Sequence, residues 1–129
     1  MINVALLGFG RIGQMHAQNI YLNKTLNLLY VYEKIDKLRK KAKKLYNCKI
    51  EKDHKKIFSD EKVDIIFISS PTNTHIRFIE EGIKHNKTIF FLVLDYRLQT
   101  SLILFYKSSQ QSFKTYNLSK NSYIQNFRP

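Results

Sequence analysis

Ile2-Asn3-Val4-Ala5-Leu6-Leu7-Gly8-Phe9-Gly10-Arg11-Ile12-Gly13 opens this 129-residue chain and decides its fold. An apolar run rich in strand formers ends in Gly-x-Gly-x-x-Gly, and a helical pattern follows it. In such a unit the first glycine allows a tight turn, the second lets the backbone approach a pyrophosphate, and the third lets the helix pack closely on the strand. The amide groups at the helix start then face an anion. The pattern predicts a dinucleotide-binding turn at Gly8, Gly10 and Gly13, with a plain strand-turn-helix as the alternative.

An acidic residue, Glu33, lies at the position where a dinucleotide-binding fold carries a carboxylate for the adenosine ribose. Leu26 to Tyr32 is a near-continuous apolar run, typical of a parallel strand that is buried on both faces. Glu33 ends this run, 20 positions after Gly13. A carboxylate there accepts hydrogen bonds from the adenosine ribose and repels a 2′-phosphate. The sequence therefore predicts NAD rather than NADP, although Lys34 lies nearby, and a solvated acid at a strand end is the alternative.

Strand and helix patterns alternate through residue 94, which predicts an α/β fold with a Rossmann-like parallel sheet and flanking helices. The helices are expected at residues 11–21, 35–45, 53–58 and 76–85, and the further strands at 48–51, 63–69 and 88–94. In the first helix, Ile12, Met15, Asn19 and Ile20 recur at helical spacing. In the last helix, Ile76, Ile79 and Ile83 form the expected buried stripe, with Thr72 or Thr74 as the cap.

The charge balance raises the question of a polyanionic partner. Lys and Arg number 22 against 10 Asp and Glu, a formal charge of +12. Lysines are densest between Lys37 and Lys44, where the aromatic residues that stack on single-stranded nucleic acid are missing. We expect a solvated helix face there, and nucleic-acid binding is the alternative.

Cysteine content and hydropathy restrict the remaining classes. Cys48 is the single cysteine, which excludes an internal disulfide, offers no metal-ligand spacing and suits a reducing cytoplasm. No uninterrupted apolar stretch is long enough to cross a membrane. We expect a cytoplasmic protein without a metal site.

A second motif, Ser70-Pro71-Thr72-Asn73-Thr74-His75, follows the buried run Val63-Asp64-Ile65-Ile66. Together with Gly8-Phe9-Gly10-Arg11-Ile12-Gly13, the following His16-Ala17 and Glu33, it makes residues 1 to about 90 resemble the cofactor-binding domain of the Gfo/Idh/MocA oxidoreductases, the inositol 2-dehydrogenases most of all. Members of this family oxidise a sugar or cyclitol hydroxyl by hydride transfer to NAD or NADP.

The resemblance implies a role for each residue of the two motifs. Gly8, Phe9, Gly10, Arg11, Ile12 and Gly13 would line the pyrophosphate. Glu33 would hold the adenosine ribose. The residues expected to border the nicotinamide half are Ser70, Pro71, Thr72, Asn73 and His75.

The chain departs from the family after the strand that begins at Thr88. The family carries Glu-Lys-Pro there, with a catalytic lysine, and a second α/β domain that supplies a catalytic aspartate and histidine. This chain reads Phe91-Leu92-Val93-Leu94-Asp95. We therefore expect no catalytic residue here, and the resemblance implies a truncated cofactor module with an uncovered sheet edge and apolar surface.

The tail also differs in composition. From Phe91 onward there is no glycine or histidine, a single acid and six serines. We expect a dinucleotide-binding domain at residues 1–95 and an atypical basic, polar tail at 96–129, with a short helix at 96–106 and loosely ordered chain beyond. The hypothesis for this change is a frame shift near codon 91, and a short gene with a novel C-terminus is the alternative.

Three functions remain open at this point. The first is a nicotinamide-dinucleotide module that is not catalytic alone, with self-association as one way of covering its apolar surface. The second is half of a split dehydrogenase, completed by a separately encoded C-terminal domain. The third is a small basic protein that binds nucleic acid, whose affinity would fall steeply with salt.

Overall fold

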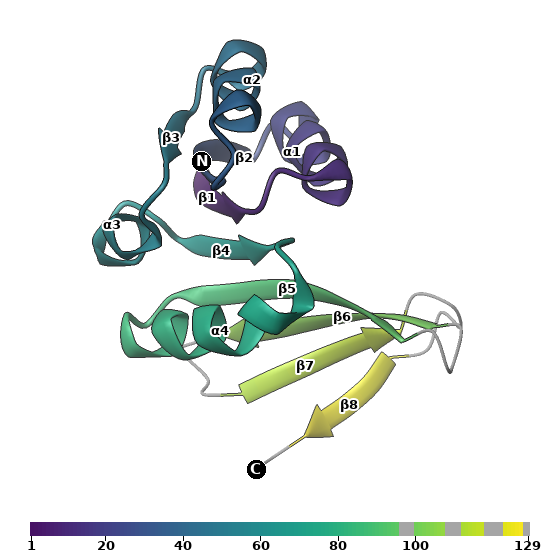
Figure 1. The fold of residues 1–129 in the computed structure, drawn as a ribbon. Coiled ribbons are helices and arrows are strands. Elements are labelled where there is room, and N and C mark those ends of the chain that lie inside the picture. The colour runs from purple at the N-terminus through teal and green to yellow at the C-terminus, as the bar shows by residue number, and fades with distance from the viewer. Residues whose placement is uncertain (96–99, 108–111, 118–122, 128–129) are drawn as a thin grey trace.

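Eight strands form one sheet in the order β3-β2-β1-β4-β5-β6-β7-β8 (Figure 1). The computed structural model describes residues 1–95, 100–107, 112–117 and 123–127. The strands are β1 (Ile2–Leu7), β2 (Leu26–Tyr32), β3 (Lys49–Glu51), β4 (Ile65–Ile68), β5 (Thr88–Asp95), β6 (Thr100–Lys107), β7 (Ser112–Asn117) and β8 (Tyr123–Phe127). The helices are α1 (Arg11–Leu22), α2 (Asp36–Tyr46), α3 (His54–Ser59), the 3₁₀ turn η1 (Thr72–Thr74) and α4 (His75–Lys84). Pairing is parallel from β3 to β5, which confirms the Rossmann-like sheet, and antiparallel from β5 to β8.

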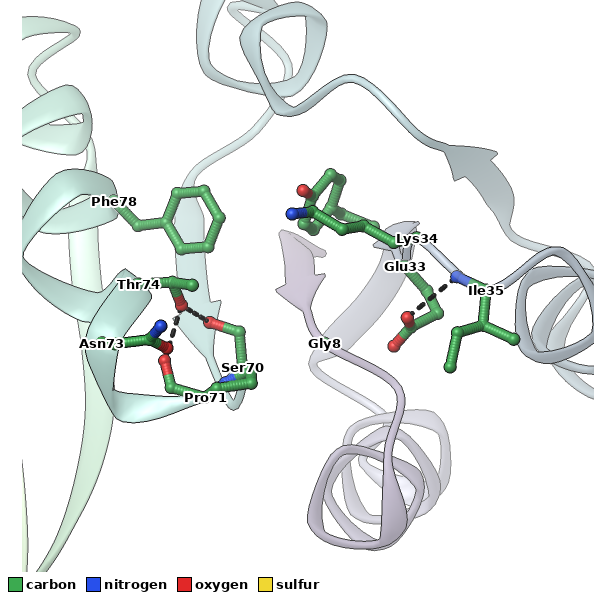
Figure 2. Close-up of a pocket in the computed structure, with 10 residues that line it drawn as sticks. Gly8, Glu33, Lys34, Ile35, Ser70, Pro71, Asn73, Thr74 and Phe78 are labelled. Atoms are coloured by element: carbon green, nitrogen blue, oxygen red, sulfur yellow. Dashed lines mark hydrogen bonds between the residues drawn. The ribbon is translucent and has the colours of Figure 1, made fainter.

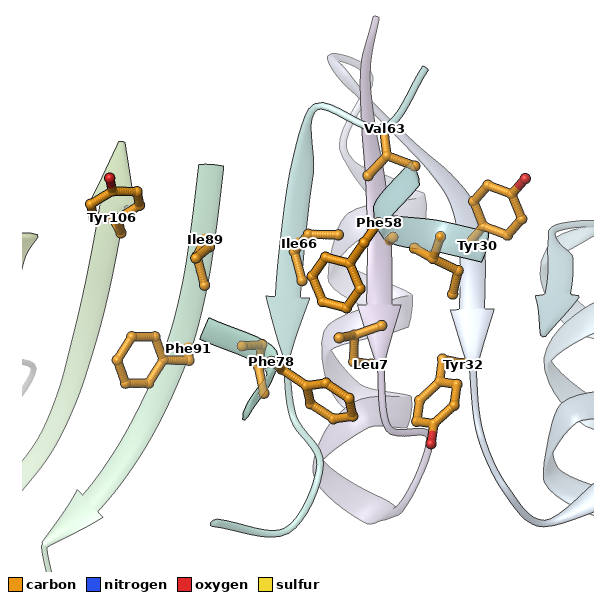
Figure 3. Close-up of a cluster of buried hydrophobic side chains, with 13 residues drawn as sticks. Leu7, Tyr30, Tyr32, Phe58, Val63, Ile66, Phe78, Ile89, Phe91 and Tyr106 are labelled. Atoms are coloured by element: carbon orange, nitrogen blue, oxygen red, sulfur yellow. The ribbon is translucent and has the colours of Figure 1, made fainter. Parts of the chain in front are cut away.

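Helices cover both faces of the parallel part of the sheet. Ala17 of α1 and Ala42 of α2 belong to a buried cluster on one face. Phe58 of α3 and Phe78 of α4 belong to a second cluster on the other face (Figure 3). Successive side chains of β1 enter the two clusters alternately, and Val4 to Leu7 are each at most 2% exposed. Burial on both faces is the reason that residues 4–7 of this strand are all apolar.

Several local predictions are confirmed. The run Leu26 to Tyr32 is strand β2 in full, and α2 begins and ends one residue later than expected. Asp53 was expected to begin a brief helix, and its carboxylate accepts a hydrogen bond from the Lys55 N–H at 3.0 Å at the start of α3. These features depend on short-range periodicity and capping, which a single segment contains.

The apolar stripes predicted for α1 and α4 are confirmed only in part, because Ile20 is buried and Ile79 packs against the core while other members are exposed. Helix α4 buries His75, Phe78 and Gly82, while Ile76 is 72% exposed and Ile83 is exposed as well. A Cβ at Gly82 would lie 2.8 Å from Ile89 Cδ1, so the glycine lets α4 approach β5 closely with Phe78 turned inward. Small residues likewise face the sheet in α1, where they let the helix approach the strands closely. This helix buries Gly13, Ala17 and Ile20 and leaves Met15 exposed.

The expected helix at 96–106 was also wrong. Residues 100–107 form β6, which pairs antiparallel with β5 so that Ile89 lies opposite Tyr106, and residues 96–99 lie outside the described residues. An unpaired edge on β5 would leave its N–H and C=O groups without partners, and pairing with β6 supplies them. The edge of β5, which was expected to be uncovered, is therefore paired with β6. Strands β7 and β8 lie within the segment expected to be loosely ordered.

A half-buried histidine on α1, His16, leads to a pH-dependent prediction. His16 packs on Phe67 with ring centroids 4.6 Å apart, and its Nε2 atom is buried without a hydrogen-bond partner. Burial lowers the pKa of His16 from its ordinary value of 6.5. The unfolded chain therefore takes up a proton at this side chain before the folded chain does as the pH falls below 6.5, and the folded state loses stability in that range.

Replacing His16 with phenylalanine is expected to raise the free energy of unfolding by about 1 kcal/mol at pH 7, because an unpaired polar atom is removed. The gain is expected to grow between pH 6.5 and 5. Urea unfolding at several pH values would measure both effects. Burial also lowers the pKa of His54, so part of the pH dependence should persist in the variant. An unchanged slope of stability with pH in His16→Phe would contradict this prediction.

Candidate functional site

A cleft opens at the carboxyl ends of β1, β2 and β4, between the glycine turn and the loop that follows β4 (Figure 2). From β1 the chain passes through α1 to β2 on one side, whereas from β4 it passes through α4 to β5 on the other. Such a reversal of direction leaves a crevice between neighbouring loops, where open α/β sheets bind ligands. The cleft has a volume of about 350 Å³. Its lining residues are Gly8, Tyr32, Glu33, Lys34, Ile35, Ser70, Pro71, Asn73, Thr74 and Phe78.

Two of the turn glycines are required by the fold. Gly8 has φ of 101°, and a Cβ there would lie 2.7 Å from the backbone nitrogen of Ser70. A Cβ at Gly13 would meet the Gly8 carbonyl oxygen at 2.1 Å. Any side chain at these positions would therefore collide with backbone. The tight turn and the close helix packing expected from the sequence are both confirmed.

Gly10 differs from the other two. Its φ of −68° suits any residue, and a Cβ there would meet no protein atom within 4 Å. It precedes α1, whose first N–H groups have no acceptor within the helix. No acidic side chain occupies the first turn of this helix. The open space beside Gly10 and these amide groups together form a cradle suited to an anion.

Glu33 is tied to the glycine turn. Its Oε2 accepts a hydrogen bond from the Phe9 N–H at 2.9 Å, and its Oε1 accepts one from the Ile35 N–H at 3.1 Å. The carboxylate thus lies beside the turn, with lone pairs left for further donors, and it forms part of one wall of the cleft (Figure 2).

The other residues of the first motif lie in different surroundings. The Phe9 side chain is fully buried and meets Tyr46 edge to face, so only its backbone belongs to the turn surface. Ile12 is half-buried and Arg11 is exposed at the start of α1. Neither of these two side chains lines the cleft.

The second wall comes from the loop after β4. The Thr74 hydroxyl donates to the Pro71 carbonyl at 2.6 Å, and the Ser70 and Thr74 hydroxyl oxygens lie 2.6 Å apart (Figure 2). Thr74 stands at the N-cap position of α4, yet neither its hydroxyl nor that of Thr72 caps the helix, contrary to expectation. The reason is the turn η1, which brings the Pro71 carbonyl within reach of the Thr74 side chain.

His75 was expected to border the nicotinamide, and the structure places it beneath the loop. It is 7% exposed, its Nε2 lies 2.8 Å from the Ser70 carbonyl, and its ring meets Phe91 edge to face. Because a carbonyl oxygen accepts, Nε2 carries the proton. Neither His75 nor Thr72 lines the cleft, whereas Ser70, Pro71 and Asn73 do. His75 therefore supports the loop from below.

Sequence reasoning missed five residues that line the cleft. They are Tyr32, Lys34, Ile35, Thr74 and Phe78. Two local signals were available for some of them. Lys34 and Ile35 directly follow the strand-end acid, and Phe78 lies one helical turn after Thr74.

Comparison with known proteins identifies the fold's family. The model of an oxidoreductase family with an NAD-binding Rossmann fold, Gfo/Idh/MocA, matches residues 2–91. The chain belongs to the Gfo/Idh/MocA oxidoreductase family. Residues 2–91 are thus the NAD-binding Rossmann fold of this family, as the two motifs predicted.

Inositol dehydrogenases are prominent among its relatives. A myo-inositol 2-dehydrogenase of Thermotoga maritima is 32% identical over 91 residues, which are 69% of this chain and 27% of that enzyme. An uncharacterised oxidoreductase, YrbE, of Bacillus subtilis is 30% identical over 90 residues, or 69% of this chain and 26% of that protein. This Gfo/Idh/MocA chain therefore spans about a quarter of the length of the curated relatives it matches.

Solved structures agree with this assignment. A putative myo-inositol dehydrogenase from Sinorhizobium meliloti superposes with a TM-score of 0.68 at 28% identity, covering 70% of this chain and 27% of that one. A scyllo-inositol dehydrogenase from Lactobacillus casei, solved with bound NAD(H) and scyllo-inositol, gives a TM-score of 0.67 at 26% identity, with 70% and 27% covered.

Membrane-spanning helices and metal-binding clusters are both absent from the described part of the chain. Among these residues no helix combines the length and apolar character that crossing a membrane requires. No group of three or more His, Cys, Asp or Glu side chains is arranged there to hold a metal ion. The buried Cys48 thiol has its pKa raised to about 11 by burial, which leaves it protonated and unreactive at neutral pH.

Proposed function

We propose that this chain binds NAD in the cleft between the glycine turn and the loop after β4, as the cofactor half of a Gfo/Idh/MocA oxidoreductase. The observation that carries this proposal is Gly10. The fold does not need a glycine there, because a Cβ would meet no protein atom. A bound pyrophosphate needs one, because its oxygens would occupy that space at the start of α1.

The two walls of the cleft have separate tasks in this proposal. The amide groups at the start of α1 hold the pyrophosphate, and the Glu33 carboxylate accepts hydrogen bonds from the adenosine ribose hydroxyls. Ser70, Pro71 and Asn73 border the nicotinamide half and exclude water from it. When bound, NAD supplies a hydride acceptor for an alcohol carbon.

Turnover requires groups that the described site does not contain. Where the resemblance implies Glu-Lys-Pro, strand β5 continues through Phe91, which is 5% exposed and paired with Ile68. A buried phenylalanine in the sheet has no proton to exchange with a substrate hydroxyl. We propose that residues 1–95 bind the cofactor and that the proton-transfer groups come from elsewhere.

Direct titration tests the proposed function. Purified full-length chain, shown to be folded by circular dichroism, is titrated with NADH while the nicotinamide fluorescence is followed. A saturable change is expected. A folded sample at millimolar concentration that produces no change would overturn the NAD-binding proposal.

Glu33 is expected to set the preference for NADH over NADPH. Replacing it with glutamine removes a negative charge that would lie beside a 2′-phosphate, so the ratio of the Kd for NADPH to that for NADH should fall at least about tenfold. Fluorescence titration with both nucleotides measures the ratio. Glu51→Gln is the matched control, because Glu51 ends the neighbouring strand β3 and does not line the cleft. Equal ratios in the two variants would contradict a role for Glu33 in this choice.

The coverage of the relatives favours a second candidate, in which the cofactor half works with a substrate-binding half on another polypeptide. The chain matches 26–27% of the relatives' lengths. This candidate predicts turnover of myo-inositol with NAD only when the two polypeptides are mixed. Absence of both turnover and co-purification with such a polypeptide would argue against it.

A further inference from the structure

Phe9 lies between the first two glycines of the turn and is held on three sides. Its N–H donates to Glu33 Oε2 at 2.9 Å, and its carbonyl oxygen accepts a hydrogen bond from Gln14 Nε2 at 3.2 Å. Its ring is fully buried against Tyr46. The peptide group that joins Phe9 to Gly10 therefore has little freedom to rotate.

The direction of that peptide group matters for an anion. In a planar trans peptide the C=O of one residue and the N–H of the next point in opposite directions. Holding the Phe9 carbonyl toward Gln14 thus fixes the Gly10 N–H on the opposite side. Gly10 is also the position where the space for a Cβ is open.

Gln14 is itself oriented by a lysine that is distant in the sequence. Lys41 Nζ on α2 donates to Gln14 Oε1 at 2.6 Å, across 27 residues of chain. An ammonium group has no acceptor, so it can only meet the oxygen of the side-chain amide. With the oxygen facing Lys41, the amide nitrogen faces the Phe9 carbonyl. The charge-assisted bond therefore determines which end of the Gln14 amide reaches the glycine turn.

Lys41 differs in this respect from its neighbours on the lysine-rich helix. Lys40 pairs with Asp36 on the same helix at 2.7 Å, whereas the bond of Lys41 leads to α1. The sequence interpretation treated these lysines alike, as one solvated face. The structure separates Lys41 from them by its contact with the first turn of α1.

We propose that Gln14 and Lys41 are positioning residues for the pyrophosphate of a bound dinucleotide, with Lys41 acting through Gln14. This inference rests on the proposed NAD-binding function. The pair holds the Phe9–Gly10 peptide in the conformation that presents the Gly10 N–H and the start of α1 to the anion. Without the pair, the turn keeps its fold and loses this preorganisation.

The test combines NADH titration with the amide NMR signal of Gly10 in the ligand-free protein. Gln14→Met keeps the length of the side chain and removes the donor, and it is expected to weaken NADH binding about fivefold and to shift the Gly10 amide signal. Lys41→Met is expected to weaken binding about threefold, and Lys41→Arg should restore it to within about twofold of the unmodified chain. Melting temperatures should stay within a few degrees for all of these variants, because no buried apolar contact is removed.

A double-variant cycle and a charge control complete the design. Gln14→Met combined with Lys41→Met should bind no more weakly than Gln14→Met alone, because both changes break one chain of contacts. Lys43→Met removes the same charge from the far side of α2 and should leave binding unchanged. Additive losses, or equal losses for Lys41→Met and Lys43→Met, would overturn the proposal in favour of a general charge effect.

The outcomes for the two proposals are distinguishable. If the unmodified folded chain fails to bind NADH, the proposed function and the inference both fail. If it binds NADH and Gln14→Met binds equally well with an unshifted Gly10 signal, the inference alone fails.

Discussion

Replacing Gly13 with alanine is expected to destabilise the protein by about 3 kcal/mol or more and to lower its melting temperature by about 10 °C. The added Cβ would lie 2.1 Å from the Gly8 carbonyl oxygen, and both partners are backbone or backbone-attached atoms that a rotamer change cannot move. Helix α1 must therefore shift away from β1. Thermal unfolding followed by circular dichroism measures the effect.

Gly82→Ala is the comparison for this change. Its Cβ would meet the Ile89 Cδ1 atom at 2.8 Å, which is the end of a flexible side chain. A smaller loss of stability is expected there, about 1 kcal/mol. A Gly13→Ala protein that melts at the temperature of the unmodified chain would show that α1 does not pack on the turn as described.

Replacing Gly10 with valine is expected to weaken NADH binding about 100-fold, with the melting temperature within about 5 °C of the unmodified chain. No protein atom lies within 4 Å of a Cβ at this position, and φ of −68° suits a β-branched residue. The side chain instead fills the space proposed for the pyrophosphate. Loss of two charge-assisted hydrogen bonds accounts for about 3 kcal/mol, which is about 100-fold.

Two controls separate this effect from a loss of structure. Gly10→Ala, with a smaller side chain, should weaken binding less than the valine variant does. Gly82→Ala lies away from the cleft and should lower stability without changing the affinity for NADH. If Gly10→Val were to bind NADH as tightly as the unmodified chain, the pyrophosphate would have to lie elsewhere, and the proposed site would be wrong.

Much of the parallel sheet was predictable because its signals are local. Leu26 to Tyr32 forms β2 as predicted, since a parallel strand covered on both faces is a near-continuous apolar run. The faces of α1 and α4 were not predictable in the same way. Helical spacing identifies a stripe, but the size of the gap beneath the helix decides whether Met15 and Ile76 or the smaller Gly13 and Gly82 face the sheet.

In the candidate site, too, some features were predictable from local sequence and others depend on tertiary packing. The glycine turn and Glu33 were identified from spacing, and the structure joins them through the bond between Phe9 N–H and the Glu33 carboxylate. His75 begins α4 directly after the loop, and its ring turns inward to the Ser70 carbonyl. A sequence motif indicates which residues lie near the cleft. The packing beneath the loop determines which of their side chains line it.

Periodicity and glycine spacing alone specify a strand, a tight turn, a helix and an acid at the end of the next strand, because each depends on residues close together in the chain. The folded structure decides what depends on distant partners. Strand β6 forms where a helix was expected because the edge of β5 offers it hydrogen bonds. Gly10 is proposed as a ligand position because no neighbouring element needs it to be glycine. Lys41 is separated from the other lysines of α2 by an amide that lies 27 residues earlier. Such contacts arise only when elements meet in space, and no local pattern encodes them.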